Sequence, residues 1–94
     1  MYAINREDLG KKGRFVIREG DKFAGEMTFT WAGEDKIIID HTGVQKEHGG
    51  KGLGKKLVME AVTFARQNEI KILPLCPFAK RVLTQDTEFK DILF

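Results

Sequence analysis

A chain of 94 residues, 41% hydrophobic and 32% charged, has the length and composition of one globular domain, which we expect to cover residues 1–94. The net charge of +2 suits an anionic ligand but gives no reason to expect a nucleic-acid partner, and no apolar run approaches the roughly 18 residues that span a membrane. The first residues lack a signal-peptide pattern and the single cysteine excludes an internal disulfide. We therefore expect a cytoplasmic location.

Hydrophobic periodicity predicts three strands in the first half of the chain, separated by glycine-containing turns. The first strand covers residues 14–18, and the second covers residues 23–31 with a period of two. The third covers residues 36–42, and its three consecutive isoleucines indicate a strand that is covered on both faces. Residues 1–13 are assigned no element.

The second half of the chain changes to a helical period. Apolar residues recur at i, i+4 from Leu53 to Ala65, which predicts an amphipathic helix of about four turns. A fourth strand is expected over residues 70–76, and its pairing should break at Pro74 because proline has no N–H to donate. A short helix over residues 77–83 and one or two helical turns over residues 87–94 follow. The order predicts an α+β mixed sheet, an antiparallel meander with one right-handed βαβ crossover.

The segment Gly49-Gly50-Lys51-Gly52-Leu53-Gly54-Lys55-Lys56 joins the third strand to the helix. Glycine lets the backbone approach a ligand closely, and the free N–H groups of a helix N-terminus favour an anion. We therefore expect a phosphate or pyrophosphate here. The glycine spacing does not fit the dinucleotide fingerprint, and Lys56 stands where a P-loop needs a hydroxyl for Mg²⁺.

The segment resembles the coenzyme A loop of the GNAT superfamily of N-acetyltransferases. Gly52-Leu53-Gly54 supplies the Gly-x-Gly of that loop, whereas Gly49 stands where arginine or glutamine is usual. The chain is most similar to a family of unusually short GNAT-like proteins, and Gly43 stands where that family usually has glutamate. The resemblance covers about residues 15–93 and is carried by three segments: Asp40-His41-Thr42-Gly43-Val44, Pro74-Leu75-Cys76-Pro77-Phe78 and Thr87-Glu88-Phe89-Lys90-Asp91-Ile92-Leu93.

The resemblance implies a minimal GNAT-like acyl-CoA N-acyltransferase fold with acetyl-CoA as co-substrate and no metal. In such a fold the strands before and after the helix splay apart, and the pantetheine arm of coenzyme A lies in the gap. Val44 and Gln45 are then expected to offer backbone groups to pantetheine. The residues expected to hold the pyrophosphate are Gly49, Gly50, Lys51, Gly52, Leu53, Gly54 and Lys55.

Cys76 and His41 are the catalytic residues that the resemblance implies. Cys76 is expected near the acetyl thioester, where it could carry the acetyl group, protonate the leaving thiolate or only contact the substrate. His41 is expected to approach the same gap and act as the base. Most GNAT enzymes use a tyrosine as the acid, but the only tyrosine, Tyr2, lies outside the motifs. His48 is interpreted as a solvated loop residue.

The expected function is transfer of an acetyl group from acetyl-CoA to an amine on a small molecule, peptide or protein, by a monomer or weak dimer. A tight turn replaces the two helices that follow the first strand in ordinary members, so the acceptor side should be open. The alternative is a non-catalytic CoA or acyl-CoA binding module with a redox link through Cys76. The missing acid tyrosine and the departures at Gly43 and Gly49 favour that alternative.

Overall fold

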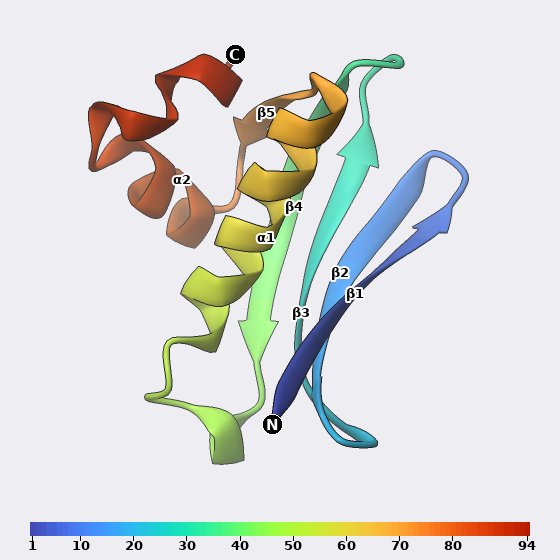
Figure 1. Ribbon diagram of the computed structural model, residues 1–94, viewed down its shortest axis with the longest axis vertical. Helices are drawn as coiled ribbons and strands as arrows, with labels where there is room; N and C mark the ends of the chain where they lie inside the picture. Colours follow the sequence, from blue (N-terminus) through green and yellow to red (C-terminus); the bar gives the residue numbers. More distant parts are fainter.

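A five-stranded mixed sheet forms the centre of the computed structural model, which describes residues 1–94 (Figure 1). The strands lie side by side in chain order. Neighbours from β1 to β4 are antiparallel, and β5 is parallel to β4, so the predicted meander and crossover are confirmed. The strands are β1 (Tyr2–Leu9), β2 (Lys12–Glu19), β3 (Lys22–Trp31), β4 (Lys36–Val44) and β5 (Lys71–Pro74).

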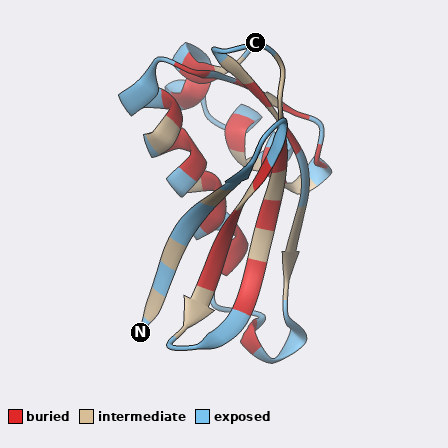
Figure 2. Cartoon of the chain, turned by 90° about the vertical axis from the view of Figure 1, so that its right-hand side faces the viewer, coloured by how far each residue is buried: buried red, intermediate tan, exposed pale blue.

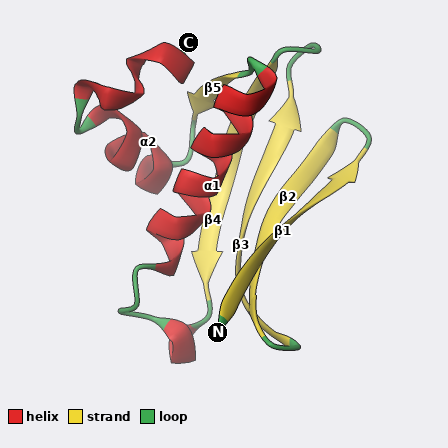
Figure 3. Ribbon diagram, in the orientation of Figure 1, coloured by secondary structure: helices red, strands yellow, loops and turns green.

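The helices gather on one side of this sheet and leave its other face uncovered (Figure 3). The helix α1 (Leu53–Asn68) makes the crossover from β4 to β5, and α2 (Pro77–Thr84) follows β5. Two 3₁₀ segments complete the chain, η1 (Lys46–His48) before α1 and η2 (Thr87–Ile92) near the C-terminus. None of the helices combines the length and apolar character that crossing a bilayer requires.

The core lies between α1 and the sheet (Figure 2). One stripe of α1 is buried because its apolar residues recur with the helical period, and it packs against alternate residues of the strands. The stripe consists of Leu53, Leu57, Val58, Ala61, Val62 and Ala65, and the sheet contributes Phe15, Ile17, Met27, Phe29, Ile37 and Ile39.

The strand β1 is absent from the sequence prediction. Its inward positions begin as apolar, since Tyr2 and Ile4 pack against the core, but the third inward position is Arg6. The Arg6 guanidinium lies 4.2 Å from the ring centre of Phe64, so a cation takes the place of an apolar side chain there. Arg6 therefore interrupts the apolar alternation that would have marked β1 as a strand in the sequence.

The strand β4 loses one neighbour halfway along its length. Its ladder with β5 runs only from Lys36 to Ile39, and Pro74 is the last residue of β5 to pair. The N–H groups of Leu75 and Cys76 both donate to the carbonyl of Ile39, at 3.1 and 3.0 Å, and the chain then turns away into α2. The splay and the end of pairing at Pro74 are as predicted, although the strand is shorter than residues 70–76.

A β-bulge falls at the same place in β4. The residue opposite Phe29 is Ile39 but the residue opposite Thr28 is His41, so Asp40 is the extra residue. Asp40 and His41 consequently both face the uncovered side of the sheet. Thr42 faces the helices.

The C-terminal tail returns to the outer edge of β5. Phe89 and Ile92 are buried, and the Phe94 N–H donates to the Ile72 carbonyl at 3.1 Å. The predicted packing of the tail against the domain is confirmed.

Candidate functional site

The glycine loop, residues 49–55, turns from η1 into α1. Gly50 and Gly52 have φ values of 76° and 72°, in the left-handed region that favours glycine, and Gly52 is the N-cap of α1. A Cβ added at either glycine would meet no atom within 4 Å. The space in front of the loop is therefore open to a ligand.

All but the first of the backbone N–H groups of this loop are unpaired. Gly49 N–H donates to the Lys46 carbonyl at 3.1 Å, and the first amide of α1 to find a helical acceptor is that of Lys56, which donates to Gly52 at 3.1 Å. The amides from Gly50 to Lys55 therefore have no backbone acceptor within the chain. Unpaired amides and the partial positive charge of a helix N-terminus both favour an anion at this end of α1.

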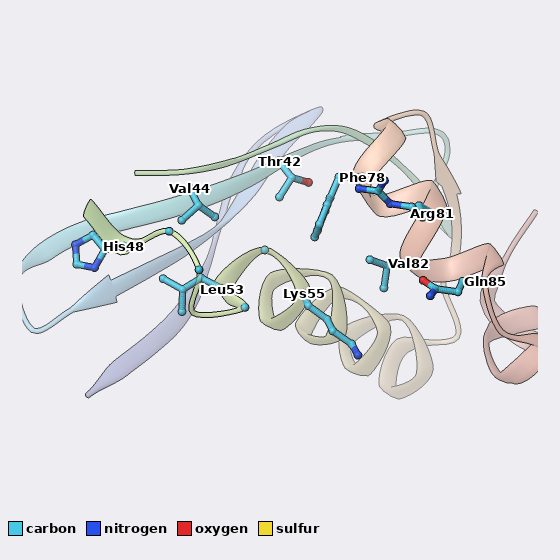
Figure 4. A pocket seen from close by; sticks show the side chains of 13 residues that line it. Thr42, Val44, His48, Leu53, Lys55, Phe78, Arg81, Val82 and Gln85 are labelled. Carbon is cyan, nitrogen blue, oxygen red and sulfur yellow. The ribbon is translucent and has the colours of Figure 1, made fainter. Parts of the chain in front are cut away.

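A cavity of about 490 Å³ opens beside these amides (Figure 4). The splayed part of β4 forms one wall with Thr42 and Val44, and the glycine loop forms another. Lys55 and Arg81 bring positive charge to the wall, and no carboxylate lines it. The cavity thus suits a ligand with an anionic end and a neutral chain. The side chains that α2 contributes are Phe78, Arg81 and Val82, and Gln85 follows at the C-cap of this helix.

Most of the residues expected to bind the cofactor line this cavity, namely Val44, Gly49, Gly50, Gly52, Leu53, Gly54 and Lys55. Gln45 and Lys51 do not. The Gln45 N–H donates to the Ala24 carbonyl at 2.8 Å, and alternation along the strand then directs the N–H groups of Thr42 and Val44 to the free edge. Backbone groups of β4 are thus free in the gap, but they belong to Thr42 and Val44.

Cys76 lies directly behind the Thr42 wall of the cavity. It is 4% exposed, is the N-cap of α2, and its thiol donates to Thr42 Oγ1 at 3.4 Å. Burial alone would raise the pKa of the thiol. The Thr42 hydroxyl and the N–H groups of Ala79 and Phe78 oppose that effect, and the pKa of Cys76 is lowered overall.

His41 does not approach Cys76 in this structure. The bulge at Asp40 places it on the uncovered face of the sheet, where it is exposed and lies opposite Thr28. A Cβ on Gly43 would lie 3.1 Å from His41 Nε2, so the glycine leaves room for the ring. His41 was expected to approach the same gap as Cys76, and the structure places the two on different sides of β4: Cys76 lies on the helical side and His41 on the open side.

His48 is buried, and its interpretation as a solvated loop residue is wrong. It is 8% exposed, lines the cavity, and its Nδ1 lies 2.9 Å from the hydroxyl oxygen of Tyr2. The pair joins residues that are 46 positions apart. The sequence could have indicated this contact only if β1 had been recognised as a strand.

The residues of α2 that line the cavity were also missed. Phe78, Arg81, Val82 and Gln85 follow one another at helical spacing, so they share one face of α2. That spacing is the signal that could have found them. Gly54 allows this face to approach α1, because a Cβ there would lie 3.0 Å from the Phe78 ring.

Comparison with solved structures gives similarity over nearly the whole chain. A GCN5-like protein from Staphylococcus aureus, solved by NMR, is 35% identical, with a TM-score of 0.71 and coverage of 96% of this chain and 87% of that chain. The ribosomal-protein-alanine N-acetyltransferase of Brucella melitensis is 20% identical, with a TM-score of 0.69 and coverage of 82% and 62%. A Bacillus subtilis acetyltransferase in complex with CoA is 17% identical, with a TM-score of 0.63 and coverage of 77% and 63%.

The Brucella and Bacillus structures, at 20% and 17% identity, support the fold alone. The Staphylococcus aureus protein, at 35% identity, and the family comparison also support membership of a family. No curated protein matches the sequence. The family described as GCN5-related N-acetyl-transferase matches residues 14–92. This segment contains the splayed strands, the glycine loop and Cys76, and the chain therefore belongs to the GCN5-related N-acetyltransferase family.

Proposed function

We propose that the cavity holds acetyl-CoA, with its pyrophosphate on the glycine loop, and that the acetyl group passes to an amine presented on the open face of the sheet. One observation carries this proposal. The unpaired amides from Gly50 to Lys55 border a cavity that runs on to the free edge of β4. An anion at one end and a chain that hydrogen-bonds a strand edge at the other match the two parts of coenzyme A.

The phosphate end is held mainly by backbone. Gly49 has no side chain to offer, so the amides of the loop supply the directed hydrogen bonds. Lys55 and Arg81 add charge from α1 and α2. The Bacillus subtilis relative was solved with CoA bound, which supports the same ligand for this cavity.

The pantetheine arm extends along the free edge of β4. Thr42 and Val44 offer N–H and C=O groups there, as a neighbouring strand would. The thioester then lies near the bulge, where β4 and β5 separate. At that point one side of the edge carries Cys76 and the other carries Asp40 and His41.

The general base and the nucleophile lie on opposite sides of the free edge of β4. On the open side, His41 takes a proton from the acceptor amine as the amine attacks the carbonyl carbon. On the helical side, the lowered pKa of Cys76 favours the thiolate, which suits a nucleophile that carries the acetyl group. In that route the Cys76 sulfur bonds to the acetyl carbon, the coenzyme A thiolate leaves, and the amine then displaces Cys76.

The acceptor approaches from the face that no helix covers. The carboxylate of Asp40 is exposed there and accepts a hydrogen bond from Thr30 Oγ1 at 2.7 Å. It forms no ion pair within the chain, unlike Glu7 and Glu26, which both pair with Arg14 at 2.8 Å. Asp40 therefore provides a counter-charge for a protonated amine beside the thioester. An open face suits a peptide or protein acceptor as well as a small amine.

The test titrates the protein with acetyl-CoA by NMR and then measures the release of CoA in the presence of a panel of amines. Acetyl-CoA should shift the resonances of the glycine loop, Thr42 and Val44, and amine-dependent release of CoA should follow. Shifts without turnover for any amine would favour the CoA-binding module, and unshifted loop resonances would refute both. His41→Ala should slow turnover by about 100-fold or more, the scale of general base catalysis.

The role of Cys76 is tested by a matched pair of variants. Incubation with acetyl-CoA alone should add one acetyl group to the protein, detected by intact-mass analysis and absent in Cys76→Ala. Cys76→Ser keeps a polar atom of similar size. Full turnover by the serine variant would show that Cys76 is a contact, and turnover by wild type without any acetylated protein would favour the proton-donor role.

A further inference from the structure

We propose that Tyr2, His48 and Lys51 form a hydrogen-bond relay that makes His48 a donor to the coenzyme A pyrophosphate, so that the N-terminal strand takes part in cofactor binding. Tyr2 begins β1, and His48 ends η1 immediately before the glycine loop. The family match starts at residue 14, so Tyr2 lies outside it. The inference rests on the proposed coenzyme A site and extends it.

The three side chains meet at the end of the cavity that holds the glycine loop. Figure 4 shows His48 at this end, on the segment that leads into the loop. The Tyr2 hydroxyl oxygen lies 2.9 Å from His48 Nδ1, and the two rings meet edge to face with centres 5.7 Å apart. Lys51 Nζ lies 3.3 Å from the same oxygen and 5.7 Å from the centre of the Tyr2 ring. Two chain segments far apart in sequence thus fix one imidazole.

The chemistry of the three groups sets the direction of the relay. The ammonium group of Lys51 can only donate, so the Tyr2 oxygen accepts its hydrogen bond. We assign the proton of the Tyr2 hydroxyl to the hydrogen bond with His48 Nδ1, because the structure offers this hydroxyl no other acceptor within the chain. A neutral imidazole that accepts at Nδ1 carries its own proton on Nε2. His48 Nε2 is therefore held as an N–H donor, and the ring makes no second hydrogen bond within the chain.

The surroundings of His48 point to an anion as the acceptor of that proton. The ring is 8% exposed yet lines the cavity, and the unpaired amides begin two residues later at Gly50. No carboxylate lines the cavity. Gly49, between His48 and those amides, offers no side chain, so the imidazole is the side-chain donor on the segment that enters the loop. A pyrophosphate on the loop amides lies within reach of a donor at this position.

Tyr2 acts through His48 in this arrangement. It does not line the cavity, and its hydroxyl forms side-chain hydrogen bonds only with His48 and Lys51. Tyr2 is consequently a positioning residue, whereas His48 is the binding residue. Loss of the Tyr2 hydroxyl should free the imidazole to exchange its proton between the two ring nitrogens.

The binding test uses calorimetry to compare three ligands and four proteins. The proteins are the wild type, Tyr2→Phe, His48→Ala and the double variant. The ligands are coenzyme A, dephospho-CoA without the 3′-phosphate, and pantetheine without the pyrophosphate. Tyr2→Phe should weaken coenzyme A and dephospho-CoA alike, by about fivefold, the effect of one hydrogen bond, and leave pantetheine unchanged. His48→Ala should weaken the first two ligands at least as much. The double variant should bind like His48→Ala, because Tyr2 acts only through His48.

The spectroscopic test begins with the wild-type protein. The ¹⁵N shifts of the His48 ring in the wild-type protein should show the proton on Nε2, and Tyr2→Phe should give a mixture of the two tautomers. The control is Thr84→Val, which removes an exposed hydroxyl that donates to the Lys80 carbonyl and should change neither result.

Three results would overturn the relay: a wild-type proton on Nδ1, wild-type affinity in Tyr2→Phe, or a Tyr2→Phe effect that persists without His48. Each leaves the proposed coenzyme A site standing as long as coenzyme A still shifts the glycine loop. Failure of the wild-type protein to bind coenzyme A is the separate result that rejects the site itself.

Discussion

The two halves of β4 are continuous in the chain but differ in their neighbours and in their burial. From Lys36 to Ile39 the strand has a neighbour on each edge, and Ile37 and Ile39 are fully buried. From Asp40 onward one edge is free and no residue of the strand is buried. Pro74 and the bulge produce this change within a few residues. A strand that loses one neighbour while staying in its sheet offers a ligand a row of fixed backbone donors and acceptors.

The largest expected effect is a loss of stability caused by a substitution in the paired half of β4. Ile39→Ala removes a fully buried side chain and should lower the free energy of unfolding by about 2–5 kcal/mol. The affinity of the folded protein for coenzyme A should stay unchanged, since the paired half contributes no group to the cavity. Chemical denaturation and calorimetry measure the two quantities. Ile38→Ala, at a half-buried neighbour, is the control and should cost less; a matching loss of affinity in Ile39→Ala would show that the halves cannot be separated.

The second prediction addresses the loop that serves the free half. Gly52→Val forces a β-branched residue into a left-handed conformation and puts side-chain atoms into the open space before the amides. Coenzyme A affinity should fall at least tenfold. Gly20→Val is the matched control, because Gly20 also has a positive φ, of 60°, and open space around its Cβ, but lies in the turn between β2 and β3. Equal losses of affinity in both variants would assign the effect to stability rather than to the ligand.

The third prediction concerns the contact that links the free half to Cys76. Thr42→Val keeps the shape of the side chain but removes the hydroxyl that lowers the pKa of the thiol. The pKa of Cys76 should therefore rise, and the rising limb of kcat/KM against pH should move to higher pH, with a several-fold loss near neutrality. The rate of thiol alkylation against pH gives an independent measurement. Thr28→Val, on the opposite face, should leave that alkylation profile where it is.

The smallest effect concerns the tail that covers the outer edge of β5. Arg66 donates to both carboxylate oxygens of Asp91 at 3.1 Å, and this hydrogen bond lowers the pKa of Asp91 below its usual value. A lowered pKa in the folded state stabilises the protein above the unfolded pKa, and the contribution is lost as the pH falls through the folded pKa. Asp91→Asn should lower the Tm slightly at neutral pH, and the difference should vanish in acid. Asp35→Asn, whose contact with Lys36 is 3.9 Å and exposed, serves as the control.

Local sequence signals predicted the parts of this fold in which the backbone conformation depends on residues of the same segment. Glycines at positions 50 and 52 indicated the phosphate loop, and the loop has the left-handed conformations that require them. Proline at position 74 indicated where pairing with β5 ends, and it ends there. In both places the residue type restricts the backbone directly, so no knowledge of distant contacts is needed.

The errors arose where a residue depends on a distant partner. The strand β1 was missed because Arg6 occupies an inward position, and only the ring of Phe64, on another element, makes that acceptable. The side of the sheet on which His41 lies was not predictable, because one extra residue, Asp40, reverses the alternation of β4 and a bulge does not alter the hydrophobic period of the sequence. His48 was misread because its partner, Tyr2, lies in the strand that was missed.

The position of the N-terminus has a practical consequence for producing this protein. Residue 1 lies at the glycine-loop end of the sheet, whereas residue 94 lies at the opposite end of the molecule (Figure 1). An affinity tag or fluorescent protein joined ahead of Tyr2 would sit beside the phosphate loop, and its charge or bulk would alter the measured affinity for coenzyme A. Protein intended for binding measurements should carry its tag at the C-terminus.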